Sequence, residues 1–411
     1  MLFRRFVWNR VRGNVVLERS RHATWGETHL QRFTVAYDLP VVFTRDAFDP
    51  ANPTFADALS RREPGKRHRM AVFADSGVLA AMPGLERAVR RYAAAHAGSL
   101  AIEGGIVTVP GGEEAKTRPG LVESLLGELA DRAIDRHSYA VAIGGGAVLD
   151  AVGYAAAIFH RGVRHVRLPT TVLAQADSGV GVKNAVNAFG TKNLVGTFAP
   201  PFAIVNDGAF IDHLPARERR SGLSEAVKVA LIRDRGFFEW IEANADALAG
   251  FHPNTLDRLI ERSARLHMRQ IAEGGDPFET GSARPLDYGH WSAHKLESLT
   301  AHKVGHGEAV AIGVALDTRY AVLAGLLPAG EDERVRRLLE KLGFVLWCEA
   351  LTLRDAGGQL AVLRGLKEFQ EHLGGELTVT LIDAVGHGVE VNRMDHALIE
   401  AAIGWLAGPQ G

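Results

Sequence analysis

Cysteine is almost missing from this chain of 411 residues, which contains only Cys348. A single thiol excludes an internal disulfide framework and fits a reducing compartment, so we expect a cytoplasmic protein. Net charge is also lacking, because 47 basic residues nearly balance 48 acidic ones and leave −1 at pH 7. Bulk electrostatics therefore give no reason to expect a nucleic-acid or membrane-surface partner.

Long apolar runs, internal repeats and low-complexity segments are absent as well. No uninterrupted apolar stretch is long enough to cross a bilayer, so the sequence predicts no membrane span. Residues 1–21 are rich in arginine but have no apolar signal core, and we expect an extra strand or a loose arm there. With 46% hydrophobic residues, the chain is long enough for two domains, each with its own core.

The first half of the chain alternates between strand and helix patterns, which is typical of a parallel sheet with helices on both faces. The predicted strands are 33–48 (with a turn at 38–40), 67–75, 100–109, 139–143 and 163–169. The predicted helices between them are 77–96, 121–135 and 147–159. After residue 210 the pattern becomes almost entirely helical. We therefore predict a Rossmann-like α/β domain over 1–210, including an N-terminal extension, and an all-α domain over 211–411. A ligand cleft is expected between them.

Three consecutive glycines, Gly144–Gly146, join a predicted buried strand to an apolar helix. Such a turn lets a pyrophosphate approach the backbone N–H groups at the helix N-terminus, although any tight strand-to-helix turn needs glycine. Asp75 ends an earlier strand, where it would accept hydrogen bonds from an adenosine ribose or cap the next helix. Glu113 and Lys116 lie in a polar loop that suits the same cofactor or forms a solvated turn. These features favour a dinucleotide site.

Four histidines and no cysteine lie between residues 284 and 308. On a helix, His290 and His294 would project from one face, because they are four residues apart. His306 follows after enough residues for the rest of that helix, a turn and the start of another. Neutral imidazole is the commonest protein metal ligand, so two of these histidines on neighbouring helices would hold a divalent ion. A third ligand must come from elsewhere in the chain.

Polar side chains gather in residues 168–193, a segment broken by glycines. Two lysines there, Lys183 and Lys192, together with several amides, suit an anionic, polyhydroxylated ligand. Further on, Glu225 and Lys228 are one helical turn apart, a spacing that an exposed helix ion pair would also show.

Seven short motifs occur in an order and with spacings that resemble one family, the sugar phosphate cyclases of the 3-dehydroquinate synthase superfamily. They are GGGAVLD (144–150), RGVRHVRLPTT (161–171), DSGVGVKN (177–184), GTKN (190–193), SEAVK (224–228), GHWSAH (289–294) and HGE (306–308). One such motif alone would be a weak signal, but seven in order are specific. The resemblance covers about 75–308 and implies the dehydroquinate synthase-like fold, with an NAD-binding half and a helical, metal-binding half.

The resemblance also implies roles for individual residues. The implied metal ligands, normally for zinc, are Glu225, His290 and His306, and the same ligands accept cobalt. The implied NAD contacts are Asp75, Glu113, Lys116, Gly144, Gly145, Gly146, Asp150, Thr170 and Thr171. The implied catalytic residues are Asp177, Lys183, Lys228 and His294. The implied substrate contacts include Lys192, Asn193 and Arg161. Arg161 matches an arginine that the family lends to a neighbour's active site, which implies a homodimer.

The family's chemistry explains why these residue types are needed. A ring hydroxyl is oxidised by NAD, phosphate is eliminated, the ketone is reduced again, the ring opens and an intramolecular aldol reaction closes a carbocycle. NAD is thus regenerated in every turnover. Lysines offset the phosphate charge, and His294 is a candidate general acid or base, a role that the leaving phosphate could also take.

The chain departs from 3-dehydroquinate synthase at several of the positions that bind substrate. Asp287 takes the place of an asparagine, and Arg284 is shifted by one residue from the family's arginine. Arg269, or His267, stands where that enzyme has a lysine, and His372 replaces another lysine. Because an aspartate repels a substrate carboxylate, the pattern is closer to 2-epi-5-epi-valiolone synthase-like members, which use sedoheptulose 7-phosphate.

Three alternatives remain open at this point. One is 3-dehydroquinate synthase acting on 3-deoxy-arabino-heptulosonate 7-phosphate, with Arg284 or Arg269 binding the carboxylate. The second is a metal-dependent polyol dehydrogenase, a family that typically has an Asp-x-x-x-His pair where this chain has Glu225 and Lys228. The third is a non-catalytic scaffold, which the retention of all three metal ligands disfavours.

Overall fold

The computed structural model describes the backbone of residues 5–11, 14–20, 28–278, 285–373 and 375–408, and the side chains from residue 28 on, apart from residues 372 and 373. It divides the chain into two units, residues 1–38 and 39–411. In the first unit, β1 (Arg5–Val11) and β2 (Asn14–Ser20) form an antiparallel hairpin. Residues 28–40 have no helix or strand, so of the predicted strand at 33–48 only β3 (Val41–Thr44) forms.

The second unit begins with a seven-stranded parallel sheet. Along the sheet the order is β3, β11 (Ala203–Asp207), β8 (Arg164–Pro169), β7 (Tyr139–Gly144), β4 (His68–Asp75) and β5 (Leu100–Ile102), while β6 (Val107–Val109) also pairs with β4. The predicted strand at 100–109 is thus two short strands on the same neighbour. The predicted parallel sheet is confirmed.

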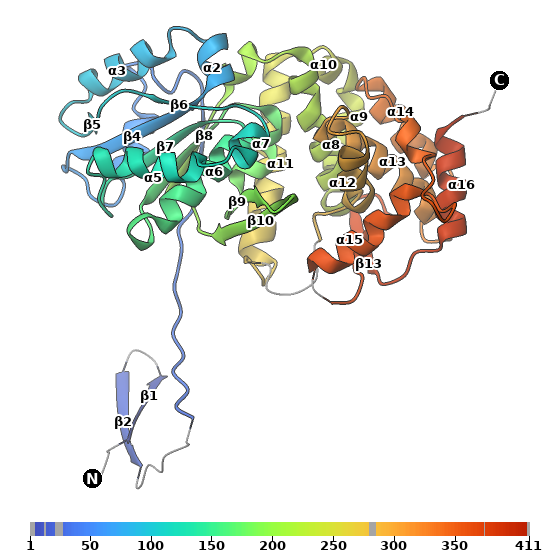
Figure 1. Ribbon diagram of the computed structural model, residues 1–411, viewed down its shortest axis with the longest axis horizontal. Coiled ribbons are helices and arrows are strands. Elements are labelled where there is room, and N and C mark those ends of the chain that lie inside the picture. The colour runs from blue at the N-terminus through green and yellow to red at the C-terminus, as the bar shows by residue number, and fades with distance from the viewer. Residues whose placement is uncertain (1–4, 12–13, 21–27, 279–284, 374, 409–411) are drawn as a thin grey trace. The chain divides into compact units, whose positions relative to one another are not determined.

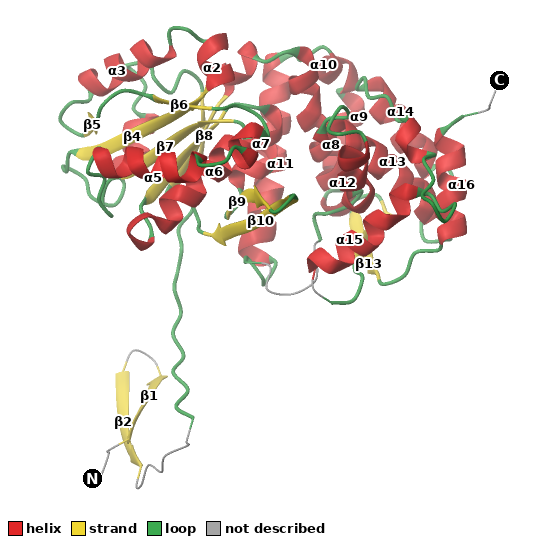
Figure 2. Ribbon diagram, viewed as in Figure 1, coloured by secondary structure: helices red, strands yellow, loops and turns green. Residues whose placement is uncertain are grey.

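Helices cover both faces of this sheet, as Figure 2 shows. They are α1 (Thr54–Ser60), α2 (Ser76–Ala81), α3 (Leu85–Ala95), α4 (Glu114–Thr117), α5 (Leu121–Asp131), α6 (Gly146–Ile158) and α7 (Val172–Ala176). Alternate residues of a strand face opposite sides, so β4 contributes to two cores. Met70 and Val72 pack with α1 and α3, whereas Ala71 and Phe73 pack with α5 and α6.

The polar segment 168–193, which we expected to suit an anionic ligand, contains α7 and leads into an antiparallel hairpin of β9 (Lys183–Ala188) and β10 (Thr191–Phe198). Phe189 and Gly190, both at positive φ, make its turn. Strand β9 packs against α6 and α4. The hairpin therefore carries the predicted substrate lysines next to the predicted cofactor helices.

The remainder of the chain is mainly helical, as predicted (Figure 1). Its helices are α8 (Ala216–Arg233), α9 (Arg235–Ala243), α10 (Ala245–Ala249), α11 (Pro253–Glu273), α12 (His290–Leu299), α13 (His306–Leu323), α14 (Glu331–Lys341), α15 (Arg364–Leu373) and α16 (His396–Leu406). The sequence analysis did not foresee the hairpin of β12 (Val379–Ala384) and β13 (His387–Val391), which packs against α8. None of the helices that the structure describes is long and apolar enough to cross a membrane.

Helix α8 is the centre of this helical part, since it is buried without interruption from Gly222 to Ile232. It contacts α7, α9, α11 and α13, and so joins the helical part to the last elements of the sheet half. The change from sheet to helices lies close to the predicted boundary at residue 210, but residues 39–411 form one compact unit and the division into two domains stays a prediction.

Candidate active site

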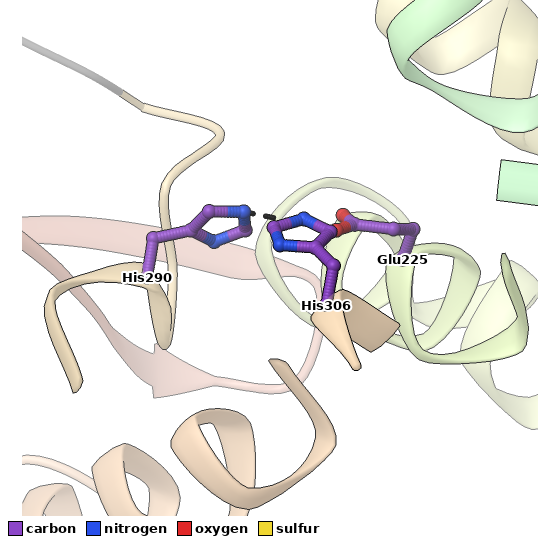
Figure 3. Close-up of side chains that lie close together, drawn as sticks. All are labelled: Glu225, His290 and His306. Atoms are coloured by element: carbon purple, nitrogen blue, oxygen red, sulfur yellow. Dashed lines mark ion pairs between the residues drawn. The ribbon is translucent and has the colours of Figure 1, made fainter. Parts of the chain in front are cut away.

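Three side chains from three different helices meet at one point. Glu225 lies in the middle of α8, while His290 and His306 are the first residues of α12 and α13. Nε2 of His306 is 3.2 Å from Oε1 of Glu225, and Nε2 of His290 is 3.7 Å from the same oxygen. Figure 3 shows both imidazole rings directed at the carboxylate. One atom from each residue can be chosen so that all three lie within 4.8 Å of one another.

The chemistry of this trio fits a divalent metal ion. Glu225 is fully buried, and neither of its oxygens has a well-formed hydrogen bond among the described residues, although Nζ of Lys228 lies 2.6 Å from Oε2. Burial raises the pKa of Glu225, but Lys228, His306 and His290 together outweigh it and lower the pKa to about 2. An ionised, buried carboxylate needs compensation. One carboxylate and two imidazoles form the ligand set of many catalytic zinc sites.

The start of α12 is held in place by its packing against α13. Gly289 has a φ of +77°, and a Cβ on Gly313 would lie only 2.1 Å from the Gly289 carbonyl oxygen. The Asp317 carboxylate of α13 accepts hydrogen bonds from the Gly289 N–H (3.1 Å) and the Trp291 indole N–H (2.9 Å). Trp291 is therefore a core residue. These contacts direct His290 toward Glu225.

Charged residues that the sequence predicted as catalytic surround the trio. Lys228 is buried one turn from Glu225, and Asp177 contacts His267, with Oδ1 and Nδ1 2.7 Å apart. Burial raises the pKa of Asp177, but Lys228 and His267 lower it well below its usual range. For Asp287, burial is likewise outweighed by the charges of His290, Lys183 and Lys228, so its pKa is lowered. Both carboxylates are ionised.

His294 lies one turn after His290 on the same face of α12. Its ring stacks on that of His306, with centroids 6.1 Å apart, and meets the His290 ring edge-on at 5.3 Å. Unlike the two other histidines, its side chain is exposed. Burial of the ring nitrogens and the charges of His290 and His306 lower the pKa of His294 to about 3, so this imidazole is neutral near pH 7 and can accept a proton from a ligand.

The predicted cofactor residues lie at the carboxyl ends of neighbouring strands. Asp75 ends β4 and caps α2 by accepting from the Gly77 N–H at 2.7 Å, so the capping role is observed. Gly144 ends β7, and a Cβ there would lie 3.1 Å from Cβ of Asp75. Gly145 and Gly146 begin α6, whose N-terminus is the expected pyrophosphate site. Thr170 and Thr171 follow β8, and Thr171 caps α7.

Glu113 lies in an exposed turn, as one of the two interpretations predicted, whereas Lys116 lies in the short helix α4 that follows. Lys116 is buried, pairs with Asp150 on α6, and donates to Oδ1 of Asn193 at 2.8 Å. Lys192 lies between two carboxylates, with Nζ 3.5 Å from Oε1 of Glu113 and 3.2 Å from Oε1 of Glu297. The β9–β10 hairpin thus connects the predicted cofactor loop with a helix of the metal site.

Four predicted substrate residues are not brought to this site by the described contacts. Arg161 is exposed in the 3-10 turn Phe159–Arg161 that follows α6. Arg269 is exposed on α11, where His267 is the residue that reaches Asp177. Arg284 lies outside the described residues. His372 belongs to α15, but its side chain is likewise not described.

Two residues of the site escaped the sequence analysis. Glu297 contacts both Lys192 and His306; its spacing of seven residues from His290 and three from His294 would have placed it on the same helical face. Arg167, fully buried on β8, donates to the carbonyl oxygens of Gly179, Gly181 and Lys183 and to the Asn184 side chain, at 2.7 to 3.1 Å. No sequence pattern indicates that this arginine fixes the segment before and at Lys183.

Comparison with known families agrees with this geometry. The 3-dehydroquinate synthase N-terminal model matches residues 106–221, and the C-terminal model of the same enzyme matches residues 222–362. The chain belongs to the 3-dehydroquinate synthase family. It is therefore an enzyme of the sugar phosphate cyclase superfamily, as its motifs indicate.

Within the 3-dehydroquinate synthase superfamily, relatives with two different names are similarly close. The chain is 36% identical to 2-epi-5-epi-valiolone synthase of Streptomyces glaucescens over 73% of this chain and 76% of that protein. It is 35% identical to 3-dehydroquinate synthase of Acidithiobacillus ferrooxidans, over 71% and 78%. Among solved structures, ValA, the 2-epi-5-epi-valiolone synthase of Streptomyces hygroscopicus with NAD+ and Zn2+ bound, has a TM-score of 0.79 and 28% identity, covering 93% and 99% of the two chains.

Proposed function

We propose that this enzyme converts a heptulose 7-phosphate, most simply sedoheptulose 7-phosphate, to 2-epi-5-epi-valiolone or an epimer, with elimination of phosphate. The single observation that carries the choice of substrate is Asp287. Its ionised carboxylate lies near His290, Lys183 and Lys228, where 3-dehydroquinate synthase has an asparagine. The Asp287 carboxylate would repel a carboxylate on the substrate, whereas substrate hydroxyl groups would donate hydrogen bonds to Asp287.

The residues of the chain fit NAD and a divalent ion, Zn2+ or Co2+. Glu225, His290 and His306 would hold the ion, and Asp75 with the glycines at the start of α6 would hold the dinucleotide. When bound, NAD supplies a hydride acceptor and donor, and the ion supplies a Lewis acid for a sugar oxygen. The overall reaction loses phosphate and forms one carbon–carbon bond without net oxidation.

The chain's own side chains account for binding and proton transfer in this proposal. Lys183, Lys192 and Asn193 offset and bind the phosphate. Lys228 keeps Glu225 and Asp177 ionised and thereby fixes the charge of the site. His294, the exposed imidazole of the group, moves protons to and from the sugar oxygens, alone or together with the leaving phosphate.

We also propose a cytoplasmic homodimer in which Arg161 acts in the site of the partner subunit. Its exposed position in the turn that follows α6 supports this arrangement. Sedimentation of the purified protein tests the dimer. Mixing an Arg161→Ala variant with an Asp177→Asn variant tests the sharing, because mixed dimers would regain one intact site and part of the activity.

The substrate is tested by incubating the purified enzyme with NAD and Zn2+ or Co2+ and each candidate sugar phosphate. We expect phosphate release and a carbocyclic product, identified by NMR, from sedoheptulose 7-phosphate. No release from any heptulose phosphate would refute the proposal.

The second candidate is 3-dehydroquinate synthase itself, which the 35% identity to that enzyme of Acidithiobacillus ferrooxidans favours. In that case the chain would complement a strain lacking the activity and would release phosphate from 3-deoxy-arabino-heptulosonate 7-phosphate.

A further inference from the structure

Glu297 is the feature of this site that neither the motifs nor the comparisons explain. It lies on α12 and is 4% exposed, so its carboxylate is held away from solvent. Its two oxygens have different partners. Oε2 is 3.1 Å from Nδ1 of His306, and Oε1 is 3.2 Å from Nζ of Lys192. One buried carboxylate thus joins a metal-site histidine to a lysine of the β9–β10 hairpin.

The two nitrogens of the His306 ring have separate tasks in this arrangement. Nε2 faces Glu225, and Nδ1 faces Glu297. A carboxylate that accepts from Nδ1–H fixes the tautomer in which Nε2 is free to bind a metal, and it holds the ring in the required plane. His290 is held in a comparable way, since its Nδ1 is 3.1 Å from the Tyr288 carbonyl oxygen.

His294, Glu297 and His306 also form a group with the spacing of metal ligands. An ion there would bind His306 through Nδ1 and would have Glu297 as a ligand. Both oxygens of Glu297 already have partners, whereas those of Glu225 lack well-formed hydrogen bonds. The ion therefore belongs at Nε2.

We propose that Glu297 is a positioning residue with two effects: it orients His306 for the metal ion, and it holds Lys192 where the sugar phosphate binds. The second effect rests on the proposed function, and the first does not. Lys192 is also 3.5 Å from Glu113, so its amino group lies between a carboxylate of the cofactor loop and one of the metal site. Loss of Glu297 leaves the lysine paired only with Glu113, away from α12.

The first test measures the affinity of the metal-free full-length protein for Co2+ alone. Glu297→Gln keeps the size of the side chain and removes its charge. We expect affinity to fall 10- to 100-fold, the usual effect of removing such a partner. The control is Glu368→Gln, which removes the same charge from an exposed residue of α15. Glu368 pairs with Lys295, a residue of α12. The control substitution should change the affinity less than twofold. A Glu297→Gln affinity equal to the control would overturn the orienting role.

The visible spectrum of bound Co2+ separates positioning from direct ligation. With Glu297 outside the ligand set, the absorption bands of the Glu297→Gln protein keep the wild-type positions, whereas those of a Glu225→Gln protein shift. If the bands shift in Glu297→Gln and keep their positions in Glu225→Gln, then Glu297 is the ligand and the proposal is refuted.

The second test is a double-mutant cycle on KM for the sugar phosphate, at saturating metal. If Glu297 acts on the substrate through Lys192, Glu297→Gln raises KM and adds nothing once Lys192→Met is present. KM effects that multiply would contradict the coupling. If the wild-type enzyme cyclises no heptulose phosphate while the Co2+ results are as expected, the proposed function fails and the orienting role stands.

Discussion

Asp317 gives the sharpest test of how the structure supports the start of α12, where His290 faces Glu225. This carboxyl group is completely buried beneath the start of α12 and accepts from the Gly289 N–H and the Trp291 indole N–H. Burial raises its pKa from 3.8 to about 7, against the smaller opposing effect of the two hydrogen bonds. Because the folded protein holds this proton more tightly than the unfolded chain, Asp317 makes the protein less stable as the pH rises from about 4 through 7.

The size of the effect follows from the two pKa values. A full shift of about three pH units corresponds to roughly 4 kcal/mol, of which about 2–3 kcal/mol falls between pH 5 and pH 8. Asp317→Asn removes the titration but leaves one of the two N–H donors without an acceptor, a loss of about 1–3 kcal/mol that does not depend on pH.

The assay is the free energy of unfolding in urea for both proteins at several pH values between 5 and 8.5, taken as the difference between them so that all other titrating groups cancel. The free energy of unfolding of wild type minus that of the variant should fall by about 2–3 kcal/mol between pH 5 and pH 8. A difference that stays constant to within about 0.5 kcal/mol would refute the reasoning, since Asp317 would then titrate alike in both states.

Three further substitutions test separate parts of the site. Asp287→Asn removes the negative charge from the substrate pocket and should improve kcat/KM for 3-deoxy-arabino-heptulosonate 7-phosphate relative to sedoheptulose 7-phosphate by about tenfold or more. Gly313→Ala places a methyl group 2.1 Å from the Gly289 carbonyl oxygen. It should lower stability by about 1–3 kcal/mol and weaken Co2+ binding, because α12 must move. Arg167→Met leaves four acceptors without their donor and should lower the free energy of unfolding by on the order of 3 kcal/mol. It should also raise KM for the sugar phosphate, because the backbone at Lys183 is no longer held in place.

Sequence reasoning predicted the sheet well because its strands are buried apolar runs that alternate with helical patterns. It predicted less where polar residues form regular structure. The β9–β10 hairpin is rich in lysine, asparagine and glycine, so nothing in its composition distinguished it from a loop. The short β12–β13 hairpin was missed for a different reason, because the apolar run of β12 lies among segments with helical patterns.

The meeting of Glu225, His290 and His306 was predictable, because the resemblance supplied Glu225 to join two histidines expected on neighbouring helices. The side chains around this trio could not be predicted from the sequence, because their positions depend on contacts between distant segments. Glu297 reaches Lys192 across 105 residues, and Asp317 reaches Trp291 across 26. Similarly, only the folded chain shows that His267, and not Arg269, lies against Asp177.

The position of the two histidines at the very beginning of their helices has an energetic consequence. The N-terminal end of a helix carries a partial positive charge. This charge destabilises a nearby cation, and stabilises a nearby anion, by about 0.3–1 kcal/mol. Helices α12 and α13 both direct this end toward the metal ligands. In the proposed function, these helix ends would therefore weaken retention of the ion slightly, and they would favour negative charge that builds up on a sugar oxygen.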